Sequence, residues 1–520
     1  MQSSSHFFKR LAWSFGLVIG ILPVTARQAR ADAHPGLTRP SAQIAAESPA
    51  QSTSADYVLI TDYGAIGDGN IANAGVNTTA MNTALATGKT VKIPYTAAGF
   101  HFGTNQITVG SGQIIEGESQ VLLKSTATTS LFRMTGFELT SGISNVSIDM
   151  TGSGASSTAI RFGTNSAVPV YRVRISKIKF SHCVEAIGDE AHATNYVVDI
   201  IIDDCMAWQT RGRQIYNRRS RGFFLIRSTN VDFTSDPAAV AWEGIRLEDY
   251  AGLELERVDV VGWGLGPRVY NPAIRSIVLN NGIALWLTRV FADSVIGDGI
   301  FINNTQFVFS LTTESSLSLG IGIILSNVEK GVFTNTMING ANGIPGAAAG
   351  AGGLYVENCR DNIFTNTYAF NCTGAGIYVT TGSVRNTFMN NSVNANGFGL
   401  ALQGNAATTK FIGGSMNGNI TAVSNATSGT GNMIRDITGY NPVGAATVTT
   451  GGSPWTYTAG ISPETLYFSA TTGVSAVTRG GVSILPAALG ANVPFTAVLS
   501  PGESIVITYS GTLNARKLVQ

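Results

Sequence analysis

Gly299-Ile300-Phe301-Ile302-Asn303-Asn304 is one copy of a hexamer that recurs along the chain. It consists of a small residue, an aliphatic residue, any residue, an apolar residue and two mostly polar residues. A repeat of about 20–30 residues built on one short alternating strand is typical of a solenoid, in which each turn packs on its neighbours. The clear copies begin at Gly244, Gly282, Gly299, Gly322, Gly353, Gly376 and Gly399, and weaker ones at Ala159, Ala186 and Gln214.

The composition favours an all-β chain with many tight corners. The 520 residues include 60 glycines, and only 12% are charged. Short β-branched runs broken by Gly and Asn dominate over runs that suit long amphipathic helices. The formal net charge of +1 gives no basis for expecting a nucleic-acid partner.

The first 31 residues have the pattern of a signal peptide. Lys9 and Arg10 precede an apolar run from Leu11 to Val24, which is short for a membrane span. Ala29-Arg30-Ala31 fits the cleavage rule for small residues. We therefore expect a secreted or periplasmic protein with no membrane span after cleavage, the alternative being an uncleaved anchor. Residues 32–54 are rich in Ala, Ser and Pro, which predicts a flexible leader.

The next stretch predicts a capped start of the solenoid. Asp62-Tyr63-Gly64-Ala65-Ile66-Gly67-Asp68-Gly69 is followed by a helix-compatible run from Thr78 to Thr87 and a strand-like run from Thr90 to Pro94. A helix laid over the open end of a β-solenoid would cover its unpaired edge.

This opening resembles that of the pectate lyase-like superfamily, which includes pectinases, rhamnogalacturonases and phage tailspike depolymerases. The resemblance extends over roughly 55–435, mostly through the repeat. It implies a right-handed parallel β-helix that acts on a polysaccharide, and the tailspike members suggest a homotrimer. The family usually has acidic residues before its helix, whereas this chain has Asn77-Thr78-Thr79.

Two domains are predicted after the leader. Residues 55–438 form the parallel β-helix, and 439–520 form a small antiparallel β domain with hairpin-like strands at Thr465–Phe468, Phe495–Leu499 and Ser504–Thr508. Pro501-Gly502 is expected to turn between the last two of these strands.

Two ladders are expected to run along the solenoid. Cys183 and Cys205 are one repeat apart, and Ile178 and Ile200 precede them by the same offset, which predicts stacked cysteines that are either disulfide-bonded or reduced. Asparagines in similar segments are expected to form a hydrogen-bonded stack, namely Asn335, Asn366 and Asn386.

The outward positions of the hexamer carry the candidate site. Because side chains alternate along a strand, Ile245 and Leu247 are predicted to face inward, and Arg246 and Glu248 outward. Stacked turns then place outward residues in columns that mix aromatic, basic and acidic groups, which suits sugar binding. The alternative is that another face or subunit covers them. The candidate catalytic residues are Tyr216, Arg218, Arg246 and Glu248, and the candidate substrate-binding residues are Arg161, Arg211, Arg213, Trp286, Phe301, Asn303 and Tyr355.

Charge separates between consecutive turns. Between Cys205 and Val231 lie six arginines and no carboxylate, whereas the stretch from Asp232 to Asp259 is strongly acidic. One interpretation is ion pairing between turns, which stabilises little at a surface. The other is a site for an acidic sugar, because guanidinium groups bind carboxylates bidentately.

Three functions remain open from the sequence. The favoured one is a polysaccharide lyase, in which arginines neutralise a uronate and Tyr216 or an arginine acts as base. A hydrolase would need two carboxylates, such as Glu248 with Asp232, Asp236 or Glu243; the chain lacks the Gly-Asp-Asp pattern of polygalacturonases. A non-catalytic carbohydrate-binding or adhesion protein is the third. No cofactor is predicted, and calcium stays open only through Asp203-Asp204.

Overall fold

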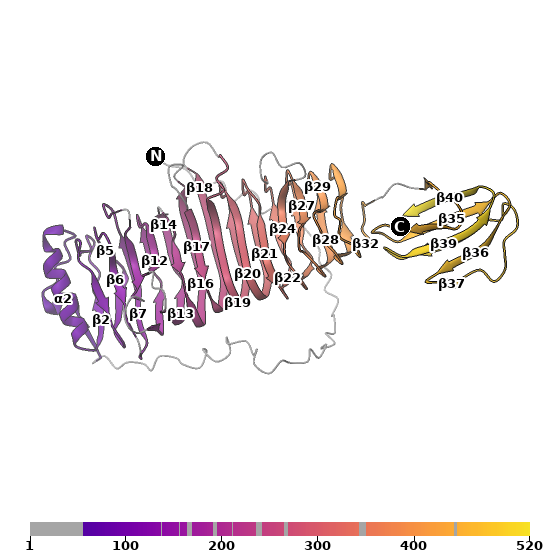
Figure 1. Cartoon of the computed structure of the whole chain (residues 1–520). Helices are drawn as coiled ribbons and strands as arrows, with labels where there is room; N and C mark the ends of the chain where they lie inside the picture. Colours follow the sequence, from indigo (N-terminus) through magenta and orange to yellow (C-terminus); the bar gives the residue numbers. More distant parts are fainter. Residues whose placement is uncertain are drawn as a thin grey trace, which may run out of the picture. The chain divides into compact units, whose positions relative to one another are not determined.

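A computed structural model describes residues 56–519 apart from 137, 155, 164–168, 191–194, 211, 236–241, 265–268, 343–349 and 441–444. The predicted signal peptide and leader therefore lie outside the described residues. In the described part, strands predominate, and the helices lie near its N-terminal end (Figure 1): η1 (Ile60–Tyr63), η2 (Ile71–Asn73) and α2 (Ala74–Ala86). The predicted all-β class is confirmed.

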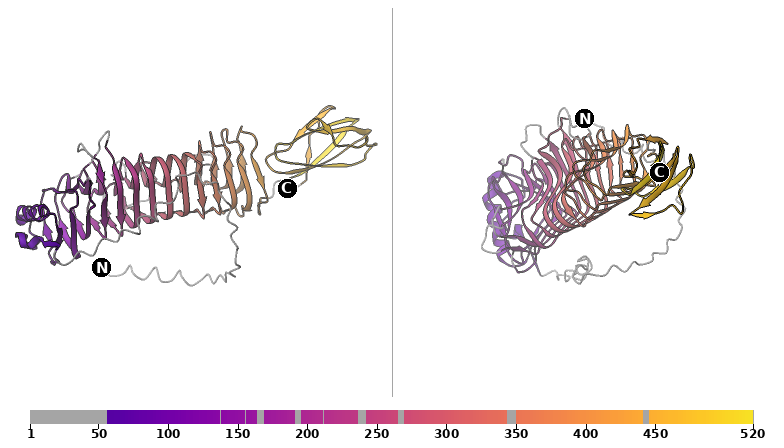
Figure 2. Two further views of the ribbon diagram at one scale, coloured as in Figure 1. Left: turned by 90° about the horizontal axis from the view of Figure 1, so that it is seen from below. Right: turned by 45° about the vertical axis from the view of Figure 1, so that its right-hand side comes forward.

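Each turn of the solenoid contributes to three parallel sheets. The two longest strands, β19 (Ile274–Asp293) and β20 (Asp298–Ser316), run through all three sheets and pair in parallel along their length. Figure 2 shows the strands of successive turns side by side in chain order. A parallel β-helix, as predicted, is the result.

The first sheet holds the hexamer and is called the hexamer sheet. It includes the N-terminal parts of β19 and β20. Its other strands are β4 (Ile107–Val109), β6 (Ser130–Met134), β8 (Thr158–Phe162), β12 (Glu185–Asp189), β15 (Ile215–Asn217), β17 (Trp242–Glu248), β21 (Ile323–Glu329), β24 (Ala351–Glu357), β27 (Ala375–Val379), β29 (Phe398–Leu402) and β31 (Thr421–Asn425).

The second sheet follows the hexamer sheet in each turn and includes the middle parts of β19 and β20. Its other strands, some of which continue into the third sheet, are β1 (Tyr57–Leu59), β2 (Thr90–Ile93), β5 (Ile114–Lys124), β7 (Ser141–Asp149), β9 (Val170–Tyr171), β10 (Val173–Ser176), β13 (Val197–Asp203), β16 (Ser220–Ser235), β18 (Ala251–Gly264), β22 (Val332–Thr334), β25 (Ile363–Thr365), β28 (Thr387–Asn394), β30 (Lys410–Ser415) and β32 (Met433–Arg435).

The third sheet closes each turn and consists partly of the C-terminal ends of β5, β7, β16, β18, β19, β20 and β28. Its own strands are β3 (Phe100–His101), β11 (Lys179–Ser181), β14 (Met206–Thr210), β23 (Met337–Asn339) and β26 (Tyr368–Phe370).

Inward-facing side chains of all three sheets fill the core. Ile245 and Leu247 are buried, as the hexamer predicted. On the second sheet, four phenylalanines stack with ring centroids 4.8, 4.4 and 4.3 Å apart, namely Phe333, Phe364, Phe388 and Phe411. A position that repeats once per turn thus builds a continuous apolar interior.

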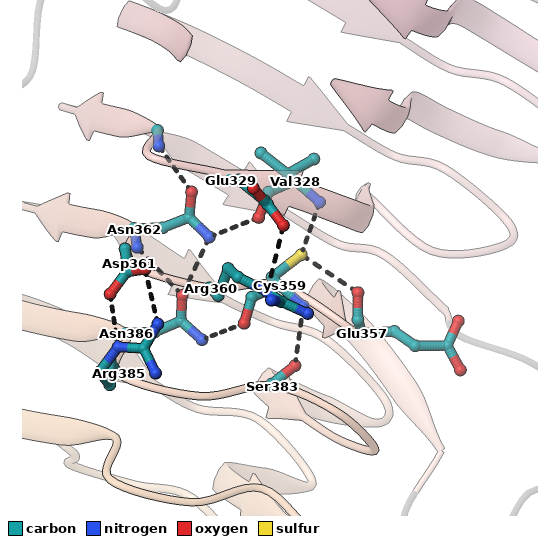
Figure 3. Close-up of polar contacts among 11 residues, drawn as sticks. Val328, Glu329, Glu357, Cys359, Arg360, Asp361, Asn362, Ser383, Arg385 and Asn386 are labelled. Atoms are coloured by element: carbon teal, nitrogen blue, oxygen red, sulfur yellow. Dashed lines mark hydrogen bonds and ion pairs between the residues drawn. The ribbon is translucent and has the colours of Figure 1, made fainter. Parts of the chain in front are cut away.

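The predicted asparagine ladder is partly wrong. Asn366 does donate to Asn335, with Nδ2 and Oδ1 3.3 Å apart. Asn386, however, pairs with buried Asn362 instead of Asn366. Phe388 is the residue that lies beside Phe364, so the register of the two strands differs by four residues from the expected one. Figure 3 shows this buried pair, in which Asn362 donates to the Val328 carbonyl and to Asn386. Buried amides thus satisfy backbone groups at the corner.

The helix over the first turn is present and longer than predicted. α2 contributes Ala80, Met81, Ala84 and Leu85 to the core of the solenoid. Asn77 is fully buried; it accepts from the Ile66 N–H at 2.7 Å and donates to the carbonyl of His101 at 3.0 Å. The residue that departs from the family pattern therefore ties the Gly-rich turn to the solenoid.

The predicted stacking of Cys183 on Cys205 is wrong. Lys179 pairs with Met206, so Ile178 rather than Cys183 lies beside Cys205. The paired residues Lys179 and Met206 are 27 residues apart, so this turn is 27 residues long. The prediction had assumed a turn of 22 residues, the spacing between Ile178 and Ile200. Both cysteines are buried and unbonded, so the disulfide alternative is excluded.

The predicted C-terminal antiparallel strands form two four-stranded sheets. One has the order β33 (Ala446–Val448), β40 (Leu513–Val519), β35 (Glu464–Ala470), β38 (Phe495–Leu499); the other has β34 (Trp455–Thr458), β39 (Ser504–Ser510), β36 (Gly473–Arg479), β37 (Val482–Ser483). β38 and β39 lie in different sheets, so Pro501-Gly502 crosses between sheets and closes no hairpin. No helix within the described ranges is long and apolar enough to cross a membrane.

Candidate functional site

The hexamer sheet brings most of the predicted site residues into two outward columns. In the first column, Tyr216 lies beside Arg246, and Phe301 follows two turns later. Tyr355 lies two turns beyond Phe301. Arg161 lies on the N-terminal side, beside Gly188. In the second column, Glu248 pairs with Asn280, and Asn280 pairs with Asn303.

Trp286 is not part of this face. Ile277 pairs with Ile245 and with Ile300, so Ser276-Ile277-Val278-Leu279-Asn280 is the copy of the hexamer in this turn. The Gly282 segment belongs to the second sheet, where Trp286 pairs with Glu254 and stacks on Phe309 with 6.0 Å between ring centroids. The prediction failed because one turn contains two segments that fit the same pattern.

Arg246 is held between two carboxylates. Its guanidinium contacts Glu243 at 2.6 Å and Glu248 in a second ion pair. Arg213 reaches the other oxygen of Glu243, with Nε and Oε2 2.9 Å apart. Glu243 is only 7% exposed, and Arg246 is 26% exposed. These contacts occupy Arg246 and Glu248 within the protein and favour a structural role for them.

Arg218 is the exception among the arginines of this region. Arg219 pairs with Asp249, and Arg227 with Asp203. Arg221 donates to the Asp249 carbonyl at 2.7 Å. The side chain of Arg218 is exposed, and in the described part of the chain its guanidinium has no ion-pair partner. It is therefore a cation that a substrate carboxylate could reach.

Tyr216 lies next to this cation and is held in its protonated form. Burial, and then the charge of Glu248, raise the pKa of its phenol, which outweighs the opposing effect of the nearby arginines. The guanidinium of Arg213 lies over its ring, 4.7 Å from the centroid. At neutral pH this phenol keeps its proton and can donate a hydrogen bond, which argues against Tyr216 as the base.

Arg161 lies closer to the N-terminal end of the same face. Its guanidinium donates to Thr158 Oγ1 at 2.6 Å and to the Ser156 carbonyl at 3.2 Å, while its Nε is buried with no hydrogen-bond partner among the described residues. Burial raises the pKa of neighbouring Glu185, which accepts from Thr158 at 2.9 Å.

Aromatic side chains continue the face beyond the charged turns. Tyr355 and Tyr378 stack with 5.4 Å between centroids, and with Phe301 they pack on a small apolar cluster that includes Ile324. The guanidinium of Arg275 lies 4.2 Å from the ring centroid of Phe301. Arg275 also pairs with Asp298, with Nε and Oδ2 3.4 Å apart. The aromatic rings therefore offer stacking surface to a sugar chain, while the charge of Arg275 is balanced within the protein.

The remaining sequence candidates do not extend this face. Arg211 and Asp236 lie outside the described residues. Asp232 lies on the third sheet, where it pairs with Val261. Both oxygens of Asp203 are taken by Arg227, at 3.0 and 2.7 Å. A calcium site at Asp203-Asp204 therefore does not fit, and the described residues contain no group of three or more candidate metal ligands.

Sequence reasoning missed a polar hollow on the first turns of the solenoid. It has a volume of about 300 Å³ and is lined by His101, Lys124, Ser125, Asp149 and Thr151. Applying the column rule to the third sheet would have found it, because His101 pairs with Lys124 and Lys124 with Asp149. The hexamer repeat is weak in these turns.

Comparisons with known proteins agree with the architecture. A family model described as a right handed beta helix region matches residues 275–438. The right-handed parallel β-helix that the resemblance implied is confirmed. No curated protein matches the chain.

Three solved structures illustrate the structural similarity. The A-module of the Azotobacter vinelandii mannuronan C-5 epimerase AlgE6 is 11% identical, with 74% of this chain and 100% of that chain covered and a TM-score of 0.46. The pre-mature gene product 12 of bacteriophage phi29 is 15% identical (74% and 56% covered, TM-score 0.43). The Agl-KA catalytic domain is 15% identical (74% and 69% covered, TM-score 0.42). With TM-scores below 0.5, they carry no conclusion about activity.

Proposed function

We propose that this β-helix protein is a secreted or periplasmic carbohydrate-active enzyme that binds a uronate-containing polysaccharide along the hexamer sheet and cleaves it by β-elimination. The observation that carries the proposal is exposed Arg218, which has no ion-pair partner among the described residues, next to protonated Tyr216. A free guanidinium beside a phenol matches a sugar carboxylate and an adjacent oxygen.

The residues of the hexamer sheet would have different roles in binding the polymer. Arg218 and Arg161 would hold carboxylates of successive uronate units, and the ring faces of Phe301 and Tyr355 would stack on sugars further along. Tyr216, in its protonated form, would donate a hydrogen bond to a sugar oxygen. Arg246 and Glu248 would keep Arg213 and Tyr216 in position through their ion pairs, a more modest role than the sequence suggested.

One assay tests the proposal. The mature protein is incubated with a panel of acidic and neutral polysaccharides, and both the absorbance of unsaturated uronates and the release of reducing ends are followed. β-Elimination produces both signals. Reducing ends without unsaturation would contradict the lyase, and binding without either product would favour the adhesion class.

Hydrolysis is the second candidate, and one observation favours it. On the third sheet, burial, and then the charges of Asp293, Glu314 and Asp232, raise the pKa of Asp259. A carboxyl group whose pKa is raised beside other carboxyl groups resembles the acid of a glycosidase. Asp259→Asn would abolish reducing-end release if this candidate is right and leave it unchanged if the hexamer sheet is the site.

A further inference from the structure

The hollow on the first turns brings together chemistry that the hexamer sheet lacks. His101, Lys124, Asp149 and Ser181 follow one another in register on β3, β5, β7 and β11 of the third sheet. Stacked turns are about 4.8 Å apart, so these side chains form one short outward column. The strands β5 and β7 lie near α2, at the N-terminal end of the solenoid (Figure 1).

Asp149 and His182 form a hydrogen-bonded pair at the edge of this column. His182 Nδ1 lies 2.9 Å from Asp149 Oδ1, and the hydroxyl and N–H of Thr151 donate to the same oxygen at 2.7 and 3.0 Å. Although burial opposes it, these hydrogen bonds hold the pKa of Asp149 below its usual value.

The charge of Asp149 sets the tautomer of His182. An ionised carboxylate can only accept, so Nδ1 carries the proton and Nε2 is left as an acceptor. The His182 side chain is 42% exposed, which leaves Nε2 accessible. The arrangement is that of a histidine base oriented by a carboxylate.

His101 is held in the opposite tautomer. Its Nδ1 accepts from the Gly103 N–H at 2.8 Å, so the proton is on Nε2. Its carbonyl is fixed by Asn77 of α2. Burial, and then the charge of Lys124, lower the pKa of His101 and keep the ring neutral at neutral pH. It therefore presents an N–H donor.

Lys124 supplies the positive charge and is positioned by the Gly-rich opening. A Cβ atom on Gly69 would lie 3.0 Å from Lys124 Nζ and 2.5 Å from the Ala98 carbonyl oxygen. No larger residue fits at position 69 without displacing this ammonium group. The opening motif thus lies beside the hollow as well as beneath the capping helix.

An exposed ring continues the column. Ser181 pairs with Trp208, whose residue is 48% exposed. An indole face two turns from Asp149 could stack on a sugar next to the one bound in the hollow. One stripe of the third sheet therefore combines hydrogen-bond donors for an anion, a histidine base oriented by a carboxylate, and an aromatic surface for stacking.

We propose that this hollow binds a uronate unit of an acidic polysaccharide, with Lys124 and His101 holding its carboxylate and His182 acting as the catalytic base. The proposal rests on the lyase function above but moves its chemistry to the third sheet, so that Arg218 and the rest of the hexamer sheet would bind the polymer without taking part in the bond cleavage. The proton on the ring carbon that bears the carboxylate passes to His182 Nε2. Its electron pair forms the carbon–carbon double bond as the bond to the glycosidic oxygen on the next carbon breaks, and that oxygen takes a proton from water.

The test measures unsaturated product from polygalacturonate and polymannuronate with the full mature chain. His182→Gln is expected to lower kcat at least 100-fold. Lys124→Met is expected to raise KM about tenfold or more, because a cation that pairs with the carboxylate is lost. Asp149→Asn, which acts through His182, is expected to lower kcat with KM unchanged. The matched control is Asp436→Asn, whose carboxylate is 75% exposed, with no effect expected.

The outcomes separate the two proposals. If the wild-type protein makes unsaturated product and folded His182→Gln and Lys124→Met variants do so equally well, the hollow is not the centre, although the lyase function stands. If the wild-type protein makes no unsaturated product from these two polymers or from any other acidic polysaccharide of the panel, both proposals fail. If His182→Gln does not fold, Lys124→Met and Trp208→Ala decide, since neither side chain is buried, and unchanged KM in both would overturn the proposal.

Discussion

At the scale of single residues, neighbouring arginines of one turn differ in what they contact. Arg213, Arg219 and Arg227 each reach a carboxylate of an adjacent turn, and Arg221 reaches a backbone carbonyl. Arg218 has no such partner among the described residues. The five described arginines of this stretch, which look equivalent in the sequence, therefore divide into four with structural contacts and one candidate for substrate binding.

The first prediction concerns Arg218. Arg218→Ala is expected to raise KM for a uronate polymer about 10- to 100-fold with kcat little changed, because a hydrogen bond to a charged group contributes about 1.5–3 kcal/mol. The unfolding midpoint should not move. Arg435→Ala, which removes an exposed ion pair with Asp436, is the control and should leave KM unchanged. Equal KM in both variants would contradict the placement.

The second prediction concerns Arg246. Arg246→Met removes a partner from nearly buried Glu243 and from Glu248, so the free energy of unfolding is expected to fall by about 1–3 kcal/mol. Urea unfolding followed by circular dichroism measures it. Arg385→Met breaks an exposed pair with Asp361 and should cost about 0–1 kcal/mol. A similar loss in both variants would show that the hexamer-sheet network is no more than a surface contact.

At the scale of strands and corners, buried amides align successive turns. Asn362 donates to Asn386 at 2.9 Å, Asn386 donates to the carbonyl of Cys359 at 2.9 Å, and Asn362 accepts from the Gly331 N–H at 2.7 Å (Figure 3). These groups have no access to water, so each must find its partner in an adjacent turn. The corner thereby sets which residues stack.

Asn386→Leu tests this role at nearly constant side-chain volume. It leaves the Cys359 carbonyl and the Asn362 amide with fewer partners, so the free energy of unfolding is expected to fall by about 2–4 kcal/mol. Asn339→Ala removes an acceptor from the long contact with Asn371 at an exposed corner and should change stability by about 0.5 kcal/mol or less. A smaller loss for Asn386→Leu than for the control would contradict the argument.

Asp259 on the third sheet is expected to make the stability of the protein depend on pH. The pKa of Asp259 is raised by burial and by Asp293, Glu314 and Asp232. Its charged form is disfavoured in the folded state, so the penalty is absent below the unfolded pKa of about 3.9 and complete above the folded pKa. Asp259→Asn is therefore expected to increase the free energy of unfolding at pH 7, with a gain that shrinks as the pH falls toward 4. A gain independent of pH would contradict this sign.

At the scale of the whole molecule, the second sheet exposes an apolar stripe. Trp286, Phe309, Val332 and Ile363 follow one another in register, and the last three are 38%, 38% and 40% exposed. Apolar residues in line over four turns are typical of a surface that a partner covers. We propose that this surface joins copies of the chain in a homotrimer, the assembly that the family resemblance suggested.

Sedimentation velocity of the mature protein tests the assembly. A trimeric species is expected, and Phe309→Asp should shift it to monomer because it places a charge in the apolar stripe. Val498→Asp, at an exposed apolar position of the C-terminal sheets, is the control and should leave the trimer intact. A wild-type monomer at micromolar concentration would contradict the prediction.

The sequence by itself determined the solenoid, its inward Ile and Leu positions and the all-β tail, because strand alternation and a repeat of one turn are local properties. It also located Arg218 beside Tyr216. Only the tertiary structure decided which copy of a pattern belongs to which sheet, because turn lengths vary. For this reason the register expected from the sequence was wrong at Trp286, Cys205 and Asn386. It also decided which charges neutralise one another and that His101, Lys124, Asp149 and His182 meet, because contacts between turns join residues 23 to 33 apart in the chain.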